Sequence, residues 1–425
     1  MRLLIKNARV IDPANNLDEL RDILVENSKI LRIAKNINNG ADKTIDATGK
    51  IVMPGLVDMH VHLREPGRED KETVATGTKA ALKGGVTTIL AMANTSPAID
   101  SPENVRLLKN IIRETAVVNV LISAAITEGR LGKVLSPIAK FRKESVVAIS
   151  DDGSSVDSPT LFYKALRKAR ENKILVICHS EDKTLSTDGV MNLGPISTRL
   201  GLKGISNESE YKRVQRDIQL SEKAKCPVHI AHVSCAESVE IIAKAKKKGV
   251  KVTCETAPHY FSLSEEALLE YDTNKKINPP LRSRKDLEAI KDGLAKGVID
   301  VIASDHAPHS ISDKDIEFDR AEFGVIGLET ELAVSITYLV QPGLLSWTEL
   351  VKKLSWNPAK ILGIVKGTLT PGKDADMIIV DPDGTWVVKK DGFISRSKNS
   401  AFIGATLKGL IVTTILGGKI VYDNR

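Results

Sequence analysis

The histidines and aspartates of this sequence gather where predicted strands end, and residues of these types could bind metal ions. The residues that share this position are His60, His62, Asp151, Asp152, His179, His232 and Asp305. Neutral imidazole and carboxylate are the ligands that Zn²⁺ takes when positions must stay open for water. A single histidine at a strand end is more often structural. Five strand ends that all carry ligand-type side chains, however, predict two metal ions bridged by a carboxylate.

His60 and His62 form the closest pair of candidate ligands. They stand two apart at the end of a predicted strand, so strand geometry places both rings on one face, which would line a barrel interior. His229 lies three residues before His232, so the same alternation sends it to the opposite face, and we interpret it as a packing residue. His306 is expected to point away from the metals.

The middle of the chain predicts a scaffold that could bring these strand ends together. Strand-like and helical runs alternate about every 30 to 40 residues. The predicted strands are residues 56–62, 86–93, 118–125, 146–150, 174–179, 228–232, 250–254 and 299–304. Predicted helices between them include residues 73–83, 161–172, 208–224 and 238–248. Eight such units favour an α/β fold of the (β/α)8 TIM-barrel type, whose catalytic residues come from the C-terminal ends of different strands.

The two ends of the chain differ from the middle in predicted secondary structure, because they consist of short strand-like runs separated by turn residues. The strand-like runs are residues 3–5, 23–25, 30–33, 375–380 and 412–416. Gly417-Gly418 then predicts a hairpin turn into residues 419–422. We therefore expect residues 1–52 and 365–425 to form one small β-sandwich domain beside a barrel of residues 53–364.

The composition narrows the classes of protein that the chain could be. Its net charge of +7 comes from basic residues interleaved with acidic ones, and aromatic residues make up only 4%, so we expect no nucleic-acid partner. No apolar stretch reaches the ~18 residues of a membrane span, and the N-terminus lacks the apolar core of a signal peptide. The four cysteines form no CxxC motif, which favours buried free thiols and a cytoplasmic location.

Two motifs resemble the signatures of the dihydroorotase family. Residues 60–67 read His-Val-His-Leu-Arg-Glu-Pro-Gly, and residues 303–309 read Ala-Ser-Asp-His-Ala-Pro-His. Residues 53–58 and 367–376 resemble elements of the wider amidohydrolase superfamily, so the resemblance runs nearly end to end. It implies a metal-dependent barrel with a small β-sandwich. It also implies reversible hydrolysis of the cyclic amide of dihydroorotate to N-carbamoyl-L-aspartate, in pyrimidine (UMP) biosynthesis.

The same resemblance implies a set of metal ligands. His60 and His62 would hold one Zn²⁺ together with Asp305, and His179 and His232 would hold the second, which gives two ions per subunit. Asp305 would have a further role, because the resemblance makes it the acid/base of catalysis. It would accept a proton from a metal-activated water and return the proton to the leaving ring nitrogen.

The fourth predicted strand departs from the wider superfamily. Hydantoinases and many dihydroorotases bridge their metals with a carboxylated lysine at this place, whereas residues 146–152 contain no lysine. Family spacing favours Asp152 over Asp151 as the bridge. The pattern resembles a bacterial and archaeal subclass of dihydroorotases, and it argues against hydantoinase and against allantoinase, the nearest rival.

Substrate contacts also follow from the resemblance. Arg64 carries the planar fork of donors that suits the carboxylate of dihydroorotate. The other contacts that the resemblance implies are Asn94, Asn278, His309 and the backbone at Phe323 and Gly324. For Asn278, which precedes two prolines, a turn-forming role is an equally open alternative.

The sequence says less about partners and mobility. A homo-oligomer and a complex with aspartate transcarbamoylase are both compatible with the family. A silent scaffold for that enzyme would have lost metal histidines, and this chain keeps every one that the motif requires. The polar segment 310–322 could be a mobile lid or a solvated loop.

Overall fold

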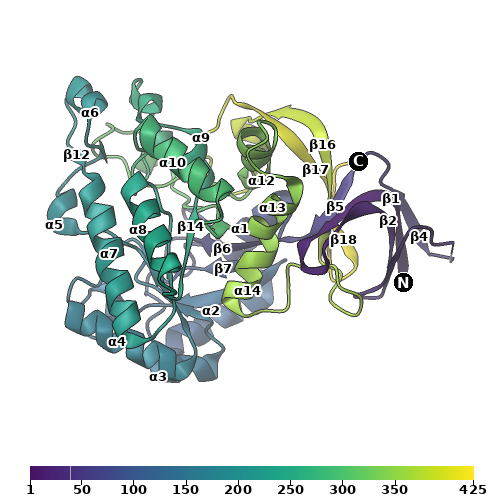
Figure 1. Cartoon of the computed structure of the whole chain (residues 1–425), viewed down its shortest axis with the longest axis horizontal. Helices are drawn as coiled ribbons and strands as arrows, with labels where there is room; N and C mark the ends of the chain where they lie inside the picture. Colours follow the sequence, from purple (N-terminus) through teal and green to yellow (C-terminus); the bar gives the residue numbers. More distant parts are fainter. Residues whose placement is uncertain (39) are drawn as a thin grey trace.

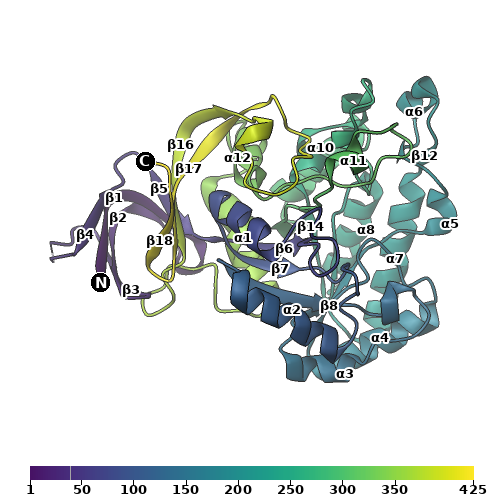
Figure 2. The ribbon, with the colours of Figure 1, turned by 180° about the vertical axis from the view of Figure 1, so that it is seen from behind.

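The computed structural model describes residues 1–38 and 40–425, and a barrel of parallel strands forms its centre (Figures 1 and 2). In hydrogen-bonded order the strands are β6 (Leu56–Val61), β7 (Val86–Ala91), β8 (Asn119–Ala124), β9 (Ala148–Ile149), β10 (Leu175–Cys178), β13 (Val228–Ile230), β14 (Val252–Thr256) and β15 (Val301–Ile302). A bridge between Val61 and His306 brings the two edges together. The predicted (β/α)8 barrel is confirmed, and the predicted strand ends agree within two residues.

Helices alternate with the strands and cover the outside of the barrel (Figure 1). The longer ones are α1 (Val74–Lys83), α2 (Pro102–Thr115), α4 (Pro159–Asn172), α7 (Asn207–Ala224), α8 (Ala236–Lys247) and α10 (Arg284–Ala295). Shorter ones are α3 (Ile138–Phe141), α12 (Glu331–Ser335), α13 (Trp347–Val351) and α14 (Asn357–Leu362). α4 begins two residues before the predicted helix 161–172, because Ser158 caps it and Pro159 occupies its first turn.

Strand alternation divides the apolar residues between two cores. Val176 and Cys178 of β10 belong to the large core shared with the surrounding helices. Ile177 between them packs in a separate cluster with Ala231 and Val301. Residues from strands around the barrel can contact one another only in its interior, so this cluster fills the barrel and supports the site above it.

Small elements decorate the loops that follow the strands. They are α5 (Lys183–Ser186), α6 (Pro195–Leu200), α9 (Pro258–Ser262), α11 (Ile311–Lys314) and the two-stranded sheet of β11 (Met191–Asn192) and β12 (Gly204–Ile205). α11 lies in the predicted polar segment 310–322. That segment is tethered inward, because the buried amine of Lys314 donates to the carbonyls of Thr273, Lys276 and Glu322.

Both chain ends contribute to one mixed sheet beside the barrel, where the N- and C-termini lie (Figure 1). Its strands are β1 (Arg2–Asp12), β2 (Leu17–Glu26), β3 (Lys29–Ala34), β4 (Lys43–Asp46), β5 (Ile51–Pro54), β16 (Met377–Val387), β17 (Thr406–Leu416) and β18 (Lys419–Asp423). β5 joins the two halves, because it pairs with β1 on one side and β16 on the other. The sheet encloses a core of its own, where Leu3 and Val25 meet Met377 and Ile415.

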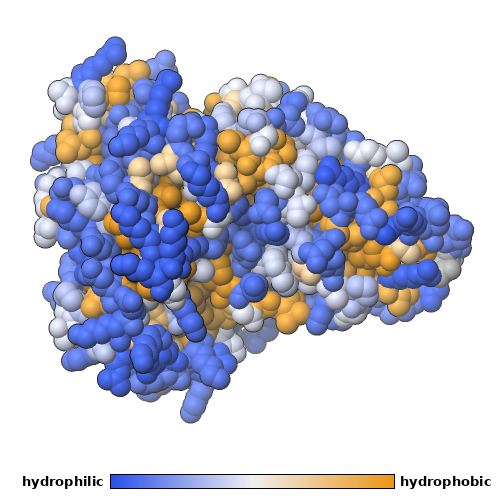
Figure 3. All heavy atoms as spheres, viewed as in Figure 1, coloured by the Kyte–Doolittle hydropathy of each residue, from blue (hydrophilic) through white to orange (hydrophobic). Residues whose placement is uncertain are grey.

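Polar residues cover most of the face seen in Figure 3, with small apolar patches between them. Within residues 1–38 and 40–425, no helix combines the length and the hydropathy that a membrane crossing needs. The four cysteines are buried and unbonded to one another, as the sequence predicts.

Asp12 connects the two chain ends at the end of β1. Its fully buried carboxylate accepts hydrogen bonds from the backbone nitrogens of Ala14 (3.2 Å) and Leu369 (2.8 Å). The same carboxylate also accepts from the side chains of Asn15 and Thr368. A buried acceptor that satisfies four donors stabilises the arrangement, and its loss would leave those donors unpaired.

We therefore expect Asp12→Ala to lower the free energy of unfolding by about 2 kcal/mol. Asp18→Ala is the matched control, because Asp18 forms a more exposed ion pair with Arg9 and should cost less than about 1 kcal/mol. Thermal and denaturant unfolding of the two variants would measure the difference. Equal stability of both variants would contradict the role assigned to Asp12.

Candidate metal centre

The six predicted metal ligands lie together at the C-terminal ends of the barrel strands. His60 and His62 end β6, and His179 follows β10 directly. His232 and Asp305 lie two and three residues beyond their strands β13 and β15. Both have positive φ, +35° and +47°, so the chain turns sharply as it leaves each strand. All of these side chains are buried.

Asp152 lies in the middle of this group. Its Oδ1 is 3.3 Å from His60 Nε2, 3.4 Å from His179 Nδ1 and 3.3 Å from His232 Nε2. Its Oδ2 is 3.4 Å from His62 Nε2. One carboxylate therefore faces four imidazoles that come from three strands, an arrangement that suits a bridge between two cations.

Asp151 points elsewhere. Its carboxylate accepts hydrogen bonds from the backbone nitrogens of Ile126 (2.8 Å) and Thr127 (3.1 Å) and from the Thr127 hydroxyl. The structure thus places Asp152, and not its neighbour, among the histidines.

The donor set fits metal ions. Two groups of three buried side chains could each hold a metal ion, because the ligand atoms within each group lie within 4.8 Å of one another. One group is His60, His62 and Asp305, and the other is His60, Asp152 and His232. Among the described residues, His60 Nε2 has no hydrogen-bond partner although carboxylate oxygens of Asp152 and Asp305 lie 3.3 and 3.6 Å away. A buried ring nitrogen held near two carboxylates without bonding either is typical of a metal ligand.

Electrostatics keep the carboxylates ionised. Burial alone would raise the pKa of Asp152, but the charge of His60 and hydrogen bonds from His179 and His232 outweigh it and hold the pKa well below its usual value. Burial opposes protonation of His179, yet Asp152 and Glu181 raise its pKa to about 9. Without metal, the protein therefore holds protons that a bound cation would displace.

Glu255 orients His60, and the sequence analysis missed it. Glu255 Oε1 is 2.6 Å from His60 Nδ1, so it fixes the tautomer that leaves Nε2 toward the centre. Burial alone would raise the pKa of Glu255, but His60 and His229 outweigh this effect and lower the pKa to about 2. The available signal was an acid within the buried run of β14, because a buried carboxylate needs a partner.

His229 lies on the opposite face of its strand from the one that strand alternation predicted. We expected it to point away from the site, but its Nε2 lies 3.1 Å from Glu255 Oε2 inside the barrel. Ala231 packs in the interior cluster, and His229 two residues earlier faces the same way. The backbone turn at His232, rather than strand alternation, carries His232 to the centre. His306 does point away, toward Glu72, as expected.

Two of the predicted substrate contacts, Asn94 and Asn278, lie close to the imidazoles, one in direct contact with a ring and the other through Glu181. Asn94 Oδ1 is 2.7 Å from His62 Nδ1, and so accepts a hydrogen bond from that ring. Asn278 Nδ2 donates to Glu181 Oε2 at 3.3 Å, and the same oxygen lies 3.1 Å from His179 Nε2. Both asparagines therefore lie at the rim of the centre, Asn278 through Glu181, which the sequence analysis also missed.

Arg64 and His309 meet beside the centre. An Arg64 terminal nitrogen lies 3.3 Å from His309 Nε2, and Arg64 Nε donates to the Pro308 carbonyl at 3.1 Å. Burial lowers the pKa of Arg64 to about 10, which leaves it cationic at neutral pH. A cation at this place suits an anionic group of a ligand.

Phe323 and Gly324 lie next to this pair. The Phe323 ring packs against the Lys276 amine, 4.6 Å from its centroid. Gly324 has φ +132°, and a Cβ there would come within 2.7 Å of Ala307 Cβ and 3.2 Å of the His309 ring. Only glycine suits this position. The Gly324 N–H donates to the Lys276 carbonyl and its carbonyl accepts from Asn399, so this backbone is firmly held.

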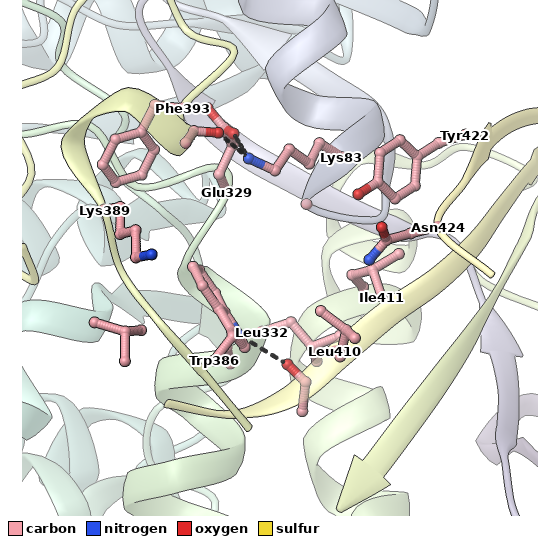
Figure 4. A pocket seen from close by; sticks show the side chains of 15 residues that line it. Lys83, Glu329, Leu332, Trp386, Lys389, Phe393, Leu410, Ile411, Tyr422 and Asn424 are labelled. Atoms are coloured by element: carbon pink, nitrogen blue, oxygen red, sulfur yellow. Dashed lines mark hydrogen bonds and ion pairs between the residues drawn. The ribbon is translucent and has the colours of Figure 1, made fainter. Parts of the chain in front are cut away.

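A separate cavity of about 260 Å³ lies between α1, α12 and the terminal sheet (Figure 4). Its lining is mainly apolar, with the Lys83–Glu329 ion pair (2.9 Å) at one edge and Trp386 hydrogen-bonded to the Gly409 carbonyl. None of the described residues that line it belongs to the metal centre. The chemistry of the molecule is therefore expected at the strand ends and not in this cavity.

Comparisons with known proteins agree with the site. A family model described as dihydro-orotase-like matches residues 49–238. A dihydroorotase of Elusimicrobium minutum is 54% identical over 100% of this chain and 98% of its own length. A dihydroorotase of Geobacter metallireducens is 49% identical over 99% of this chain and 100% of its own length. The similarity therefore spans both the barrel and the terminal sheet.

Solved structures give the same architecture. An L-hydantoinase from Arthrobacter aurescens superimposes with a TM-score of 0.90 at 28% identity and covers 99% of this chain and 96% of its own. A dihydropyrimidinase from Brevibacillus agri gives 0.88 at 25%, with 100% and 95% covered. Fold and site together are those of the metal-dependent amidohydrolase barrels. Within that class, the chain belongs to the dihydroorotase family.

The position of Glu255 generates a prediction about metal binding. Glu255→Ala removes the acceptor that orients His60, so we expect metal affinity to fall by about 10- to 100-fold. Metal retained after dialysis against graded chelator would measure it. Glu265→Ala is the control, since that buried carboxylate bonds Asn192 and no histidine. Wild-type retention by Glu255→Ala would overturn the assignment.

Proposed function

We propose that this chain catalyses the reversible hydrolysis of the cyclic amide of dihydroorotate to N-carbamoyl-L-aspartate, with two Zn²⁺ ions in the barrel. One observation carries the proposal. The Asp152 carboxylate faces four histidines at 3.3–3.4 Å, in a chain 54% identical to a dihydroorotase over its whole length. The reverse, ring-closing direction would serve pyrimidine biosynthesis.

We assign the ligands from their mutual distances. His60 and His62 would hold the first ion with Asp305, whose Oδ1 lies 3.6 and 3.4 Å from their Nε2 atoms. His179 and His232 would hold the second, since their facing nitrogens are 2.8 Å apart.

The assigned bridge is Asp152. Its Oδ2 faces His62, and its Oδ1 faces His60, His179 and His232, so this carboxylate lies next to histidines of both proposed ligand sets. The fourth strand offers no lysine to do the same work.

Asp305 is the proposed catalytic acid/base. Bound zinc would supply a coordinated water of lowered pKa and would polarise the scissile carbonyl. Burial would raise the pKa of Asp305, but His60 and His62 hold it below its usual value, so its carboxylate can accept a proton. Asp305 would take that proton from the attacking water and deliver it to the leaving ring nitrogen as the carbon–nitrogen bond breaks.

Substrate recognition would use the residues around Arg64. The Arg64 guanidinium and the His309 ring would bind the carboxylate of dihydroorotate, with Asn94 beside them. Asn278 and the backbone at Phe323 and Gly324 would contact the ring amide. Because the Gly324 N–H and C=O already bond within the protein, the backbone contact would use a remaining carbonyl lone pair.

Other features of the biology stay proposals of the same kind. The four buried free thiols suit the reducing cytoplasm, where we expect the chain to work. Self-association and a complex with aspartate transcarbamoylase are both compatible with the family, and sedimentation of the chain alone and with that enzyme would test each of them.

A substrate panel with metal analysis tests the function. We expect purified protein to contain two Zn²⁺ per chain and to hydrolyse dihydroorotate in strong preference to hydantoin and allantoin. Chelation should abolish turnover, because it removes the source of the nucleophile, and added zinc should restore it. Hydantoin is the natural comparison, because the fold superimposes on a hydantoinase with a TM-score of 0.90. A preference for hydantoin would refute the substrate assignment.

A single substitution tests the acid/base. Asp305→Asn is close in shape but cannot carry the proton, so we expect turnover to fall by about 10³-fold or more. Metal content of the same preparation serves as the control, since it separates a lost proton carrier from a lost ligand. Near-wild-type turnover at full metal content would rule Asp305 out.

A further inference from the structure

Lys71 is a buried cation with an unusual partner. Its side chain is 3% exposed, and its Nζ lies 3.0 Å from Nδ1 of His309 and 3.1 Å from Oδ2 of Asp313. A lysine amine is expensive to bury without such partners. Neither the metal ligands nor the contacts proposed above include Lys71.

The two nitrogens of the His309 ring face two different cations. Nδ1 faces Lys71 at 3.0 Å, and Nε2 faces a terminal nitrogen of Arg64 at 3.3 Å. Burial, together with Arg64, Lys71 and Lys314, lowers the pKa of His309 to about 2, so the ring is neutral. A neutral imidazole has one N–H donor and one acceptor nitrogen, so it can accept from only one of the two cations.

Geometry decides which nitrogen accepts. Lysine and arginine can both only donate, so the ring accepts from the closer of the two cations, which is Lys71 at 3.0 Å from Nδ1 rather than Arg64 at 3.3 Å from Nε2. Asp313 Oδ2 lies 3.7 Å from Nδ1, too far to accept a hydrogen bond from it. Lys71 is held in place, because its backbone carbonyl accepts from Ser397 Oγ at 2.6 Å. Arg64 is less completely buried than Lys71, and its Nε donates to the Pro308 carbonyl. This geometry favours Nδ1 as the acceptor, which would leave the ring proton on Nε2.

We infer that Lys71 is a positioning residue for substrate recognition, because it fixes His309 as the tautomer whose Nε2–H points toward Arg64. Two donors, the His309 Nε2–H and the Arg64 guanidinium, then converge on one place. Such a pair selects a ligand with an anionic acceptor there, such as a carboxylate. The inference rests on the proposed contact between His309 and the dihydroorotate carboxylate.

A purely structural role for Lys71 would look different. Asp313 needs no lysine to cap α11, because the same Oδ2 accepts from the Ser310 N–H (2.9 Å) and hydroxyl (2.7 Å). The contact that only Lys71 provides is therefore the one to His309. Its loss should affect carboxylate binding more than the fold.

The test compares Lys71→Met with Lys71→Arg, which keeps a donor, and with Lys353→Met. Lys353 is an equally buried lysine whose one partner among the described residues is the Ile299 carbonyl, so it controls for loss of a buried amine. We expect Lys71→Met to raise KM for dihydroorotate by about tenfold with a much smaller change in kcat. Lys71→Arg should restore part of the loss, and Lys353→Met should leave KM unchanged.

Nitrogen-15 NMR of the histidine rings gives a second readout that a structural role would not move. Wild-type His309 should carry its proton on Nε2, and Lys71→Met should shift the population toward Nδ1–H. An Nδ1–H tautomer in the wild type would overturn the inference, even if Lys71→Met fails to fold. An unchanged KM in folded Lys71→Met would overturn it as well.

His309→Asn separates this inference from the proposed function. If His309→Asn leaves KM for dihydroorotate unchanged, the proposed substrate contact of His309 is wrong. If His309→Asn raises KM but Lys71→Met does not, only the positioning role is wrong. If both are right, adding Lys71→Met to His309→Asn should have little further effect, because the two act through one ring.

Discussion

The site depends on one buried carboxylate, that of Asp152, surrounded by imidazoles. An ionised group in the barrel is stable only when opposite charges and hydrogen bonds compensate for its desolvation. Four rings at 3.3–3.4 Å provide that compensation in the protein alone. Bound metal ions would replace the protons that these histidine rings carry. The barrel makes this arrangement possible, because it brings the ends of β6, β10 and β13, which carry the four rings, to one place.

An outer layer of polar groups fixes the direction of three of the four rings. Glu255 bonds the far nitrogen of His60, Asn94 that of His62, and Glu181 that of His179. Each contact leaves the opposite nitrogen free to face the centre. Lys71 stands in a similar relation to His309, with a donor in place of an acceptor. A hydrogen bond to the far ring nitrogen would then orient both the metal-binding histidines and the substrate-binding His309.

The terminal sheet holds the first ligand strand in place. β5 lies between the N-terminal and C-terminal strands of the sheet and leads through Gly55 directly into β6. A side chain at residue 55 would overlap Thr87 of β7 at 2.3 Å, so the passage from sheet to barrel is tightly packed. Asp12, at the end of β1, accepts hydrogen bonds from Thr368 and Leu369 and so joins the N-terminal strands to the C-terminal segment. β5, which leads into the strand that carries His60, is therefore held by strands from both chain ends.

The sequence by itself determined the barrel, the six candidate ligands and the family, because strand periodicity and short motifs are local properties. Family spacing favoured Asp152 over Asp151, and the tertiary structure shows why, because the Asp151 carboxylate is held by the backbone nitrogens of Ile126 and Thr127. Only the tertiary structure decided that His229 lies inside the barrel beside Glu255. It also brought Lys71 to His309 across 238 residues of chain. Such contacts depend on backbone turns and on packing between distant segments, and no local pattern encodes either.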